Sequence, residues 1–329
     1  MFVKKSEKIL IVCILVLIFV CSLYLSTFAG YKDFGLHLFK KAFCLNGDTD
    51  SILLEVLRFP RVLKAVIAGA CLATSGMFMQ AVSKNPLAEP YITGISSGAG
   101  LGIVISIMFF SGINYALFGF SGALIAAFLV IFFCGLSKLS VTKLILVGLS
   151  VNMFVSSIIS FVILKNPDKA YSMMYILSGG VTKNGGLSDL AITLLFVFAM
   201  ICAAVLIPKL NFLRLESSFL PNMKKQQDFY TVLMIVVSAF LAAVSVLSAG
   251  ILGFVGIIAP QISKKIIGRD YRWVFFVNIL LGSILILISD LIARCVIYPL
   301  QIPLGLVVAL IGSPIFVYFL LKKGALLND

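Results

Sequence analysis

RFPRVLKAVIAGACLATSGMFMQAVSKNPLAEPYITGISSGAGLG, residues 58–102, is the stretch that decides the fold of this chain. A polar Asn-Pro-Leu-Ala-Glu-Pro turn separates two apolar runs, each long enough for a helix. In both runs small residues recur four positions apart and so share one helix face: Ala65, Gly69 and Ala73, then Gly94, Gly98 and Gly102. In lipid such faces let helix backbones approach closely, because packing rather than the hydrophobic effect drives association there. We expect both runs to be transmembrane helices that other helices surround.

The composition of the whole chain agrees with a membrane protein. Hydrophobic residues make up 61% of the 329 residues and charged residues 12%, and the mean hydropathy is +1.15. A hydrocarbon core ~30 Å thick needs about 20 apolar residues per helix. Such spans are predicted near residues 9–29, 62–82, 91–111, 114–136, 143–164, 189–208, 230–250, 274–293 and 303–321, with a tenth, broken by Pro260, at 251–268. The fold class is therefore an all-α, polytopic integral membrane protein. Residues 1–329 form one transmembrane domain, because the connections are too short to hold a soluble one.

The N-terminal run follows Lys4, Lys5 and Lys8 and resembles a secretory signal. It is longer than the ~7–15 residues of a usual signal core, so we predict the first transmembrane helix instead. Lysine and arginine concentrate in the cytoplasmic loops of membrane proteins. With ten spans and a cytoplasmic N-terminus, 16 of the 26 basic residues lie on the cytoplasmic side. Both termini are therefore expected in the cytoplasm.

The chain lacks the motifs of the common enzyme classes. It has no GxxxxGK[ST] phosphate loop, no HExxH and no GxSxG sequence. Its seven cysteines form no CxxC pair, and its one histidine, His37, is predicted in a loop, so no metal site or bound cofactor is expected. The net charge of +13 is dispersed over short loops, which suits contact with anionic lipid and not nucleic-acid binding.

Charged residues inside predicted spans are scarce, and they are the usual indication of function in a membrane protein. Asp290 and Arg294 lie four residues apart in one span, so they share a helix face and can form an intramembrane ion pair. The pair either neutralises itself near the helix end or has a functional role. An ion-driven carrier would show more buried acids along its path.

Five ordered sequence blocks carry a resemblance to a known family. They are residues 58–102, LSVTKLILVGLS (139–150), MMYILSGG (173–180), GILGFVGIIAPQI with GRDYR (250–272), and LISDLIARCV with IPLGLVVALIGSPIFVYFLL (287–321). Together they resemble the FecCD/BtuC-type permeases, the membrane subunits of ABC importers for iron–siderophore complexes, haem and cobalamin. The resemblance implies a type II ABC importer permease in the bacterial cytoplasmic membrane. It also implies a second permease subunit (homodimer or heterodimer), two ATP-binding subunits that hydrolyse ATP in place of this chain, and an extracytoplasmic substrate-binding lipoprotein.

The resemblance also suggests roles for individual residues. Family arginines that dock the binding protein match Arg58, Arg61 and Arg294. The family's gate and translocation path match Asn85, Leu87, Ser140, Thr142, Gly179 and Gly180. A cytoplasmic loop at about 209–229 matches the element that contacts the ATPase, and its candidate coupling residues are Leu215, Glu216, Lys224 and Lys225.

The chain departs from the family pattern at three places. Gln261 stands where a histidine is usual, and Gln301 stands where a glutamate is common, so neither position can be a proton-linked switch. The 209–229 loop lacks the family's glycines, so its shape must differ. The leading hypothesis is the permease of an iron-chelate importer. A cobalamin importer, an ion-driven secondary transporter with broken helices and a scaffold that no longer transports are the alternatives.

Overall fold

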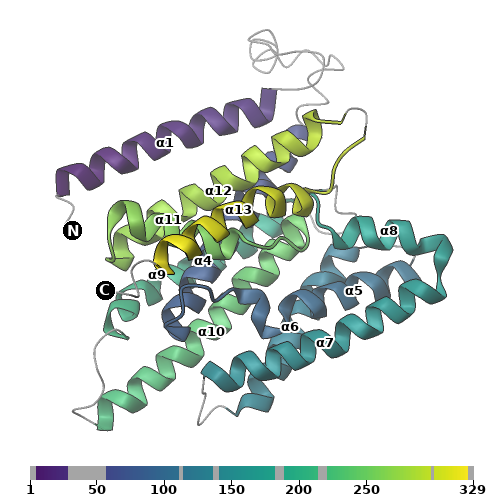
Figure 1. Cartoon of the computed structure of the whole chain (residues 1–329), viewed down its shortest axis with the longest axis horizontal. Coiled ribbons are helices and arrows are strands. Elements are labelled where there is room, and N and C mark those ends of the chain that lie inside the picture. Colours follow the sequence, from purple (N-terminus) through teal and green to yellow (C-terminus); the bar gives the residue numbers. More distant parts are fainter. Residues whose placement is uncertain are drawn as a thin grey trace.

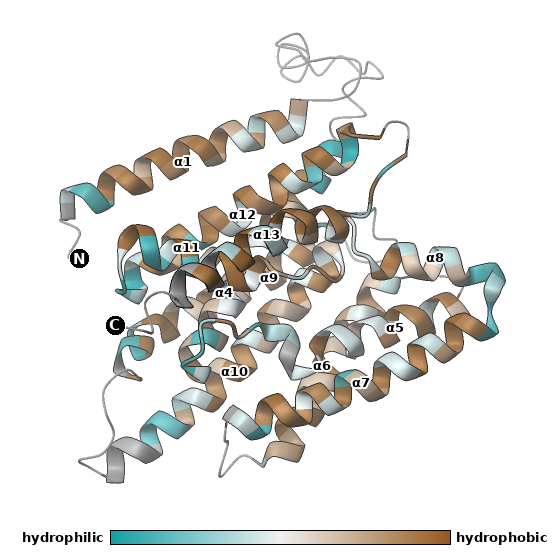
Figure 2. Cartoon of the chain, in the orientation of Figure 1, coloured by the Kyte–Doolittle hydropathy of each residue, from teal (hydrophilic) through white to brown (hydrophobic). Residues whose placement is uncertain are grey.

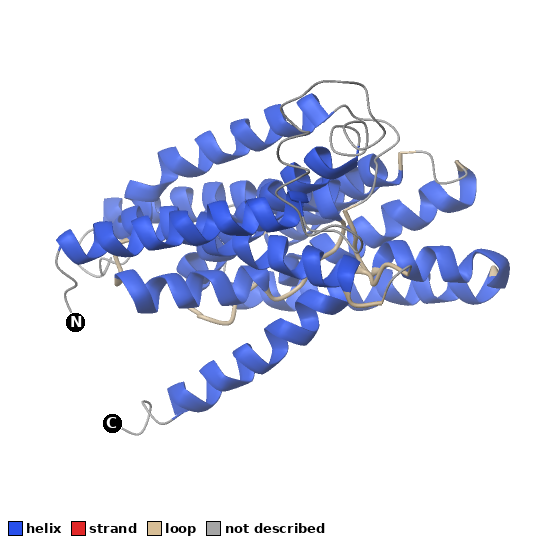
Figure 3. Cartoon of the chain, turned by 90° about the horizontal axis from the view of Figure 1, so that it is seen from above, coloured by secondary structure: helices blue, strands red, loops and turns tan. Residues whose placement is uncertain are grey.

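The computed structural model describes residues 5–28, 57–110, 114–135, 141–181, 189–213, 221–297 and 300–324. In these ranges it contains eleven α-helices, one 3₁₀ helix and no strand, so the predicted all-α fold is confirmed (Figures 1 and 3). The elements are α1 (Lys5–Phe28), α4 (Phe59–Ser83), η2 (Pro90–Thr93), α5 (Ile95–Phe109), α6 (Tyr115–Cys134), α7 (Val141–Lys165), α8 (Pro167–Leu177), α9 (Asp189–Phe212), α10 (Pro221–Ala249), α11 (Val255–Ile267), α12 (Tyr271–Cys295) and α13 (Leu304–Gly324).

Seven of these helices are long and apolar enough to cross a membrane: α1, α4, α6, α7, α9, α10 and α12. Two shorter apolar helices, α5 and the first part of α13, coincide with two further predicted spans. The predicted broken span appears as the short helix α11, with Pro260 inside it. Hydrophobic residues cover the middle of most helices and hydrophilic residues gather near their ends, as expected of segments that cross a bilayer (Figure 2).

Two segments differ from the sequence-based expectation. Residues 165–188 were expected to be a connection, yet Pro167–Leu177 forms the helix α8, with Pro167 in its first turn. Proline suits that position because its fixed φ fits a helix and its missing N–H would have no partner there. Similarly, α10 begins at Pro221, about nine residues before the predicted span. Apolar periodicity detects buried helices, so it misses a mostly exposed one such as α8.

Helix α4 lies at the centre of the bundle. In its most apolar window 89% of residues are buried, against 11% for α7 at the periphery. A Cβ added at Gly69 would meet the backbone of Gly282 in α12, and one at Gly76 would meet the backbone of Gly256 in α11. A second contact of this kind joins Gly98 and Gly102 of α5 to α6. The predicted small-residue faces are therefore the surfaces at which these helices touch.

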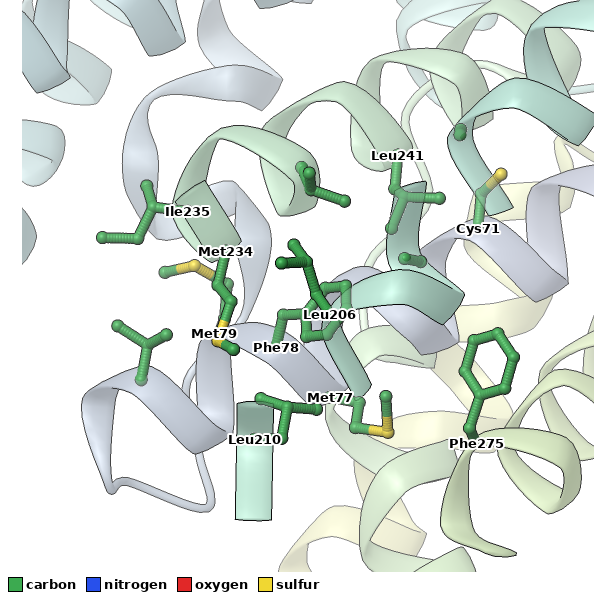
Figure 4. Packing of buried hydrophobic residues seen from close by; sticks show 14 of the residues in the cluster. Cys71, Met77, Phe78, Met79, Leu206, Leu210, Met234, Ile235, Leu241 and Phe275 are labelled. Carbon is green, nitrogen blue, oxygen red and sulfur yellow. The ribbon is translucent and has the colours of Figure 1, made fainter. Parts of the chain in front are cut away.

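Three consecutive large side chains fill the space around the end of α4 that carries Gln80. Met77, Phe78 and Met79 are buried against residues of α9, α10 and α12 (Figure 4). Leu206 of α9 and Met234 of α10 belong to the same apolar cluster. Helix α4 thus presents small residues where backbones must touch and bulky ones where space must be filled, which fixes its rotation about its own axis.

Helix α1 lies along one edge of the molecule and packs mainly on α12 (Figure 1). Figure 3 shows α13, the helix that leads to the C-terminus, leaning away from the bundle. Leu310 and Leu321 on α13 are 73% and 72% exposed, and Leu164 on α7 is 81% exposed. In this single chain α7 and α13 therefore have large faces that no other described helix covers.

Candidate functional site

Two polar clusters lie near opposite ends of α4. The arginine cluster consists of Arg58, Arg61, Asp290, Arg294 and Gln301, and the glutamine network consists of Gln80, Gln261 and Lys264. Arg61 and Gln80 are separated along α4 by a distance of about 28 Å at 1.5 Å per residue. This is close to the ~30 Å thickness of a hydrocarbon core. The two clusters therefore belong to opposite membrane surfaces.

In the arginine cluster two guanidinium groups share one carboxylate. Asp290 on α12 is fully buried. Its Oδ1 accepts hydrogen bonds from Nε and Nη2 of Arg61 at 3.0 and 2.9 Å, and its Oδ2 lies 3.0 Å from Nε of Arg294. The Asp290–Arg294 pair follows from the spacing of four residues. The second partner, Arg61 on α4, is 229 residues away in the chain, so no sequence pattern indicated it.

Other contacts hold the same arginines. Nη1 of Arg61 donates to Oε1 of Gln301 at 3.0 Å, and Nη2 of Arg294 donates to the carbonyl of Ser26 at 2.8 Å. Nη1 of Arg58 donates to the carbonyl of Thr27 at 3.1 Å. The cluster thus joins the end of α1 to α4, to α12 and to the segment that precedes α13. Three arginines and one carboxylate leave two positive charges in excess within this cluster.

The glutamine network compensates for the proline inside α11. Pro260 has no N–H, so the carbonyl of Gly256 has no helical donor four residues on. Nε2 of Gln80 donates to this carbonyl at 3.2 Å and to that of Ile257 at 3.1 Å. Oε1 of Gln80 accepts from Gln261 Nε2 and Lys264 Nζ, both at 2.8 Å. A single buried amide therefore attaches α4 to a helix with an interrupted hydrogen-bond ladder.

Residues 84–94, the connection after α4, are attached to the break between α10 and α11. Oε1 of Glu89 accepts from the N–H of Phe254 at 2.9 Å, and the hydroxyl of Tyr91 accepts from the N–H of Leu252 at 3.3 Å. Phe254 has a φ of 67°, which is unusual for a residue other than glycine, so the break is strained as well as bonded. Burial raises the pKa of the Glu89 carboxyl to about 7, and the N–H of Phe254 offsets part of that rise.

The predicted gate residues are exposed at one end of the bundle where they are described. Asn85 forms a tight turn in which its Oδ1 accepts from the N–H of Leu87 at 2.9 Å, and the side chain of Leu87 is 38% exposed. Thr142 is exposed near the start of α7, whereas Ser140 lies outside the described residues. Asn152 of α7 attaches the connection 84–94 to α7, because its Nδ2 donates to the carbonyl of Tyr91 at 3.1 Å.

Gly179 and Gly180 form a junction of three backbone segments. Gly179 has a φ of 77°, and an added Cβ would lie 2.6 Å from the carbonyl oxygen of Ile251. The N–H of Gly180 donates to the carbonyl of Ala249 at 3.0 Å, and the N–H of Leu304 donates to the carbonyl of Gly179 at 3.0 Å. Gly179 is buried and Gly180 is partly buried, and in this structure the pair supports the junction of these backbone segments.

The predicted coupling residues are only partly described. Leu215 and Glu216 lie outside the described residues, while Lys224 and Lys225 lie in the first turns of α10. In Figure 1 this end of α10 extends beyond the neighbouring helices. No group of three or more His, Cys, Asp or Glu side chains that could hold a metal ion occurs among the described residues.

Both the sequence and the structure of this chain are similar to those of known transport proteins. A family model described as the FecCD transport family matches residues 10–322. The Fe(3+)-citrate import system permease protein YfmD of Bacillus subtilis is 30% identical over 98% of this chain and 97% of its own length. The protein named siderophore transport system permease protein YfiZ, from the same organism, is 32% identical over 98% of both chains. The protein named heme-iron transport system permease protein IsdF, from Staphylococcus aureus, is 30% identical over 98% of both chains.

A solved structure has the same architecture. It is described as a metal-chelate type ABC transporter in an inward-facing conformation. The match covers 96% of this chain and 99% of the other, with a TM-score of 0.77 and 26% sequence identity.

Proposed function

Because the chain belongs to the FecCD transport family, we propose that it is the membrane-spanning permease subunit of an ABC importer and that its cargo is an iron chelate. One observation supports this most strongly. Over 98% of its length the chain is similar to permeases named for ferric citrate, siderophore and haem-iron transport. The absence of a phosphate loop fits a permease whose ATP is bound and hydrolysed by a separate subunit.

Basic residues are concentrated in the predicted cytoplasmic loops, and this supports an orientation with both termini in the cytoplasm. In that orientation the arginine cluster faces the outside and the glutamine network faces the cytoplasm. An outward surface with excess positive charge suits an acidic partner, because opposite charges steer encounter and fix the register of docking. The partner we infer is the extracytoplasmic substrate-binding protein, with Arg58, Arg61 and Arg294 as its contacts.

The uncovered faces of α7 and α13 support a second permease subunit. Helix α7 carries Ser150, Ser157 and Ser160 on its exposed side, and each hydroxyl bonds the carbonyl four residues earlier in its own helix. The exposed side of α7 combines these hydroxyls with large apolar side chains such as Met153, Phe154 and Phe161, so it can contact both water and a large, partly apolar chelate. We infer that this face lines the translocation path and that the second subunit closes the path from the other side.

The cytoplasmic parts have separate roles in this proposal. Asn85, Leu87, Ser140 and Thr142 form the gate, because small polar groups and one leucine can close a path without burying a charge. The start of α10, with Lys224 and Lys225, contacts the ATP-binding subunit. Since Asn152 and Glu89 attach the connection 84–94 to α7 and to the α10–α11 break, displacement of α10 would reach the gate through bonded backbone.

Transport by the reconstituted system tests the function. The permease, its ATP-binding subunit and a binding protein from the same organism are placed in vesicles, and uptake of ferric citrate, haem, a ferric hydroxamate and cobalamin is compared. We expect ATP-dependent uptake of one of the iron chelates. Uptake of cobalamin alone would show that the cargo is not an iron chelate, and it would leave the assignment as a permease subunit intact. Uptake by this subunit alone, driven by an ion gradient, would overturn the function.

A further inference from the structure

Asp290 does more than neutralise its helix neighbour Arg294. Its carboxylate is 0% exposed and binds the guanidinium groups of Arg61 on α4 and Arg294 on α12. The side chains of these two arginines are 19% and 14% exposed. If the acid served only to cancel one buried charge, a single arginine would be enough. Two arginines on one carboxylate keep a positive charge at the surface while the acid that holds them stays out of a partner's reach.

The remaining contacts of these arginines fix their orientation. Arg61 is held between Asp290 and the amide oxygen of Gln301, and Arg294 is held between Asp290 and the carbonyl and hydroxyl of Ser26, at 2.8 and 3.1 Å. A guanidinium group is planar and binds carboxylates through a fork of N–H donors. Arginines that are already oriented lose less conformational entropy when a carboxylate arrives, so preorganisation favours binding.

We propose that Asp290 is a positioning residue, which sets the spacing and orientation of Arg61 and Arg294 for carboxylates on the substrate-binding protein. This inference rests on the proposed function. Arg58 completes the docking surface from the N-cap position of α4, where its side chain donates to the carbonyl of Thr27. Gln301 contributes as a neutral acceptor, because an amide oxygen orients Arg61 without cancelling its charge.

The substitution Asp290→Asn separates positioning from simple charge attraction, because the two predict opposite signs. The amide is nearly isosteric, and the cluster gains one positive charge. If net charge alone attracted the binding protein, association would tighten. If Asp290 positions the arginines, association weakens despite the added charge, by about tenfold or more, which is the loss of one well-formed charged contact.

Asp189→Asn is the matched control. Asp189 pairs with Lys64 at 2.9 Å, one turn along α4 from Arg61, and within the described residues no hydrogen bond or ion pair joins it to the arginine cluster. The substitution removes one negative charge from the same end of the bundle without disturbing the arginines. We expect this variant to bind at least as tightly as the wild type, because the substitution adds positive charge at this end without moving the arginines.

The measurement uses the assembled permease and ATPase complex in lipid nanodiscs. The probe is the binding protein from the same organism that stimulates ATP hydrolysis by the wild-type complex, and its affinity is measured at low and at physiological salt. If no binding protein stimulates the wild type, the proposed function fails and this inference fails with it. If the wild type responds and Asp290→Asn binds equally well or better, only this inference is overturned. Equal weakening by Asp290→Asn and Asp189→Asn would also overturn it.

A second variant covers the case in which Asp290→Asn does not fold. Gln301→Ala removes one of the two supports of Arg61, changes no charge and leaves the buried carboxylate paired. We expect several-fold weaker association and an unchanged dependence on salt. Wild-type affinity in Gln301→Ala would show that the orientation of Arg61 is irrelevant to docking and would overturn the proposal.

Discussion

The close approach of α4 and α12 leads to a prediction about a single methyl group. In Gly69→Ala the new Cβ would lie 2.6 Å from the carbonyl carbon of Gly282 and 2.7 Å from Cα of Ser283. Carbon atoms attract best at about 3.5–4.0 Å, so the two backbones must separate by about 1 Å. The obstacle is backbone, which cannot rotate away as a side chain would. Overpacking of this kind costs about 1–3 kcal/mol of the free energy of unfolding.

This cost can be measured by thermal unfolding, with thiol labelling as the readout. Cys71 and Cys134 are buried, so a fluorescent maleimide reaches them only on unfolding, after the accessible thiols have been blocked with a colourless reagent. At about 2–4 °C per kcal/mol, we expect Gly69→Ala to lower the Tm by several degrees. The control is Gly253→Ala, because an added Cβ there has no atom within 4 Å, and its Tm should match the wild type.

The double variant Gly69→Ala with Gly282→Ala refines the prediction. Separation of α4 from α12 relieves both contacts at once, so the double variant should lose less stability than the sum of the two single variants. A wild-type Tm for Gly69→Ala would refute the reasoning, because it would mean that the two backbones do not touch. An equal loss in Gly253→Ala would refute it too, since the effect would then belong to any glycine and not to this contact.

Three further outcomes are expected. Gln80→Leu leaves the carbonyl of Gly256 without its donor and should lower the free energy of unfolding by about 1–3 kcal/mol, whereas loss of stability below that range would indicate that water replaces the amide. The pKa of Glu89 is raised from 4.5 to about 7, so the folded state binds more protons than the unfolded state between these pH values. The free energy of unfolding should therefore fall by about 3 kcal/mol as pH rises from about 4.5 to 7. Glu89→Gln should abolish this contribution when melting is measured across the same pH range. Arg58→Glu combined with Arg61→Glu should abolish uptake of the iron chelate while the protein still inserts into the membrane, and normal uptake by this variant would remove the docking role of both arginines.

The helices themselves were predictable because each needs only a property that is local in the sequence. A run of about 20 apolar residues has no stable alternative to a helix in lipid, since every backbone polar group must be bonded within the segment. Gly250 and Gly253 marked the break before α11, whereas Pro260, which was expected to break this span, lies inside the continuous helix Val255–Ile267. The exposed helix α8 was missed, because it contributes Met173 alone to the buried residues and so carries no apolar period.

The candidate site was predictable in part and for the same reason. Asp290 and Arg294 pair within one helix, where spacing determines distance. The attachment of Gln80 to α11 crosses 176 residues, and its cause is a carbonyl orphaned by proline in a different helix. Gln261 was read as a lost titratable group, and the structure gives it a specific role as donor to Gln80 and to the carbonyl of Pro86 at 2.9 Å.

The sequence by itself determined that this chain is a bundle of membrane helices and which faces of α4 and α5 are small enough for close contact, because composition and spacing are properties of a single segment. The tertiary structure alone decided which backbone each small face touches, that Arg61 shares the carboxylate of Asp290, and that Glu89 holds the α10–α11 break. Those facts depend on the relative positions of helices that are far apart in the chain. Such positions follow from packing the whole bundle at once, and no single stretch of sequence contains them.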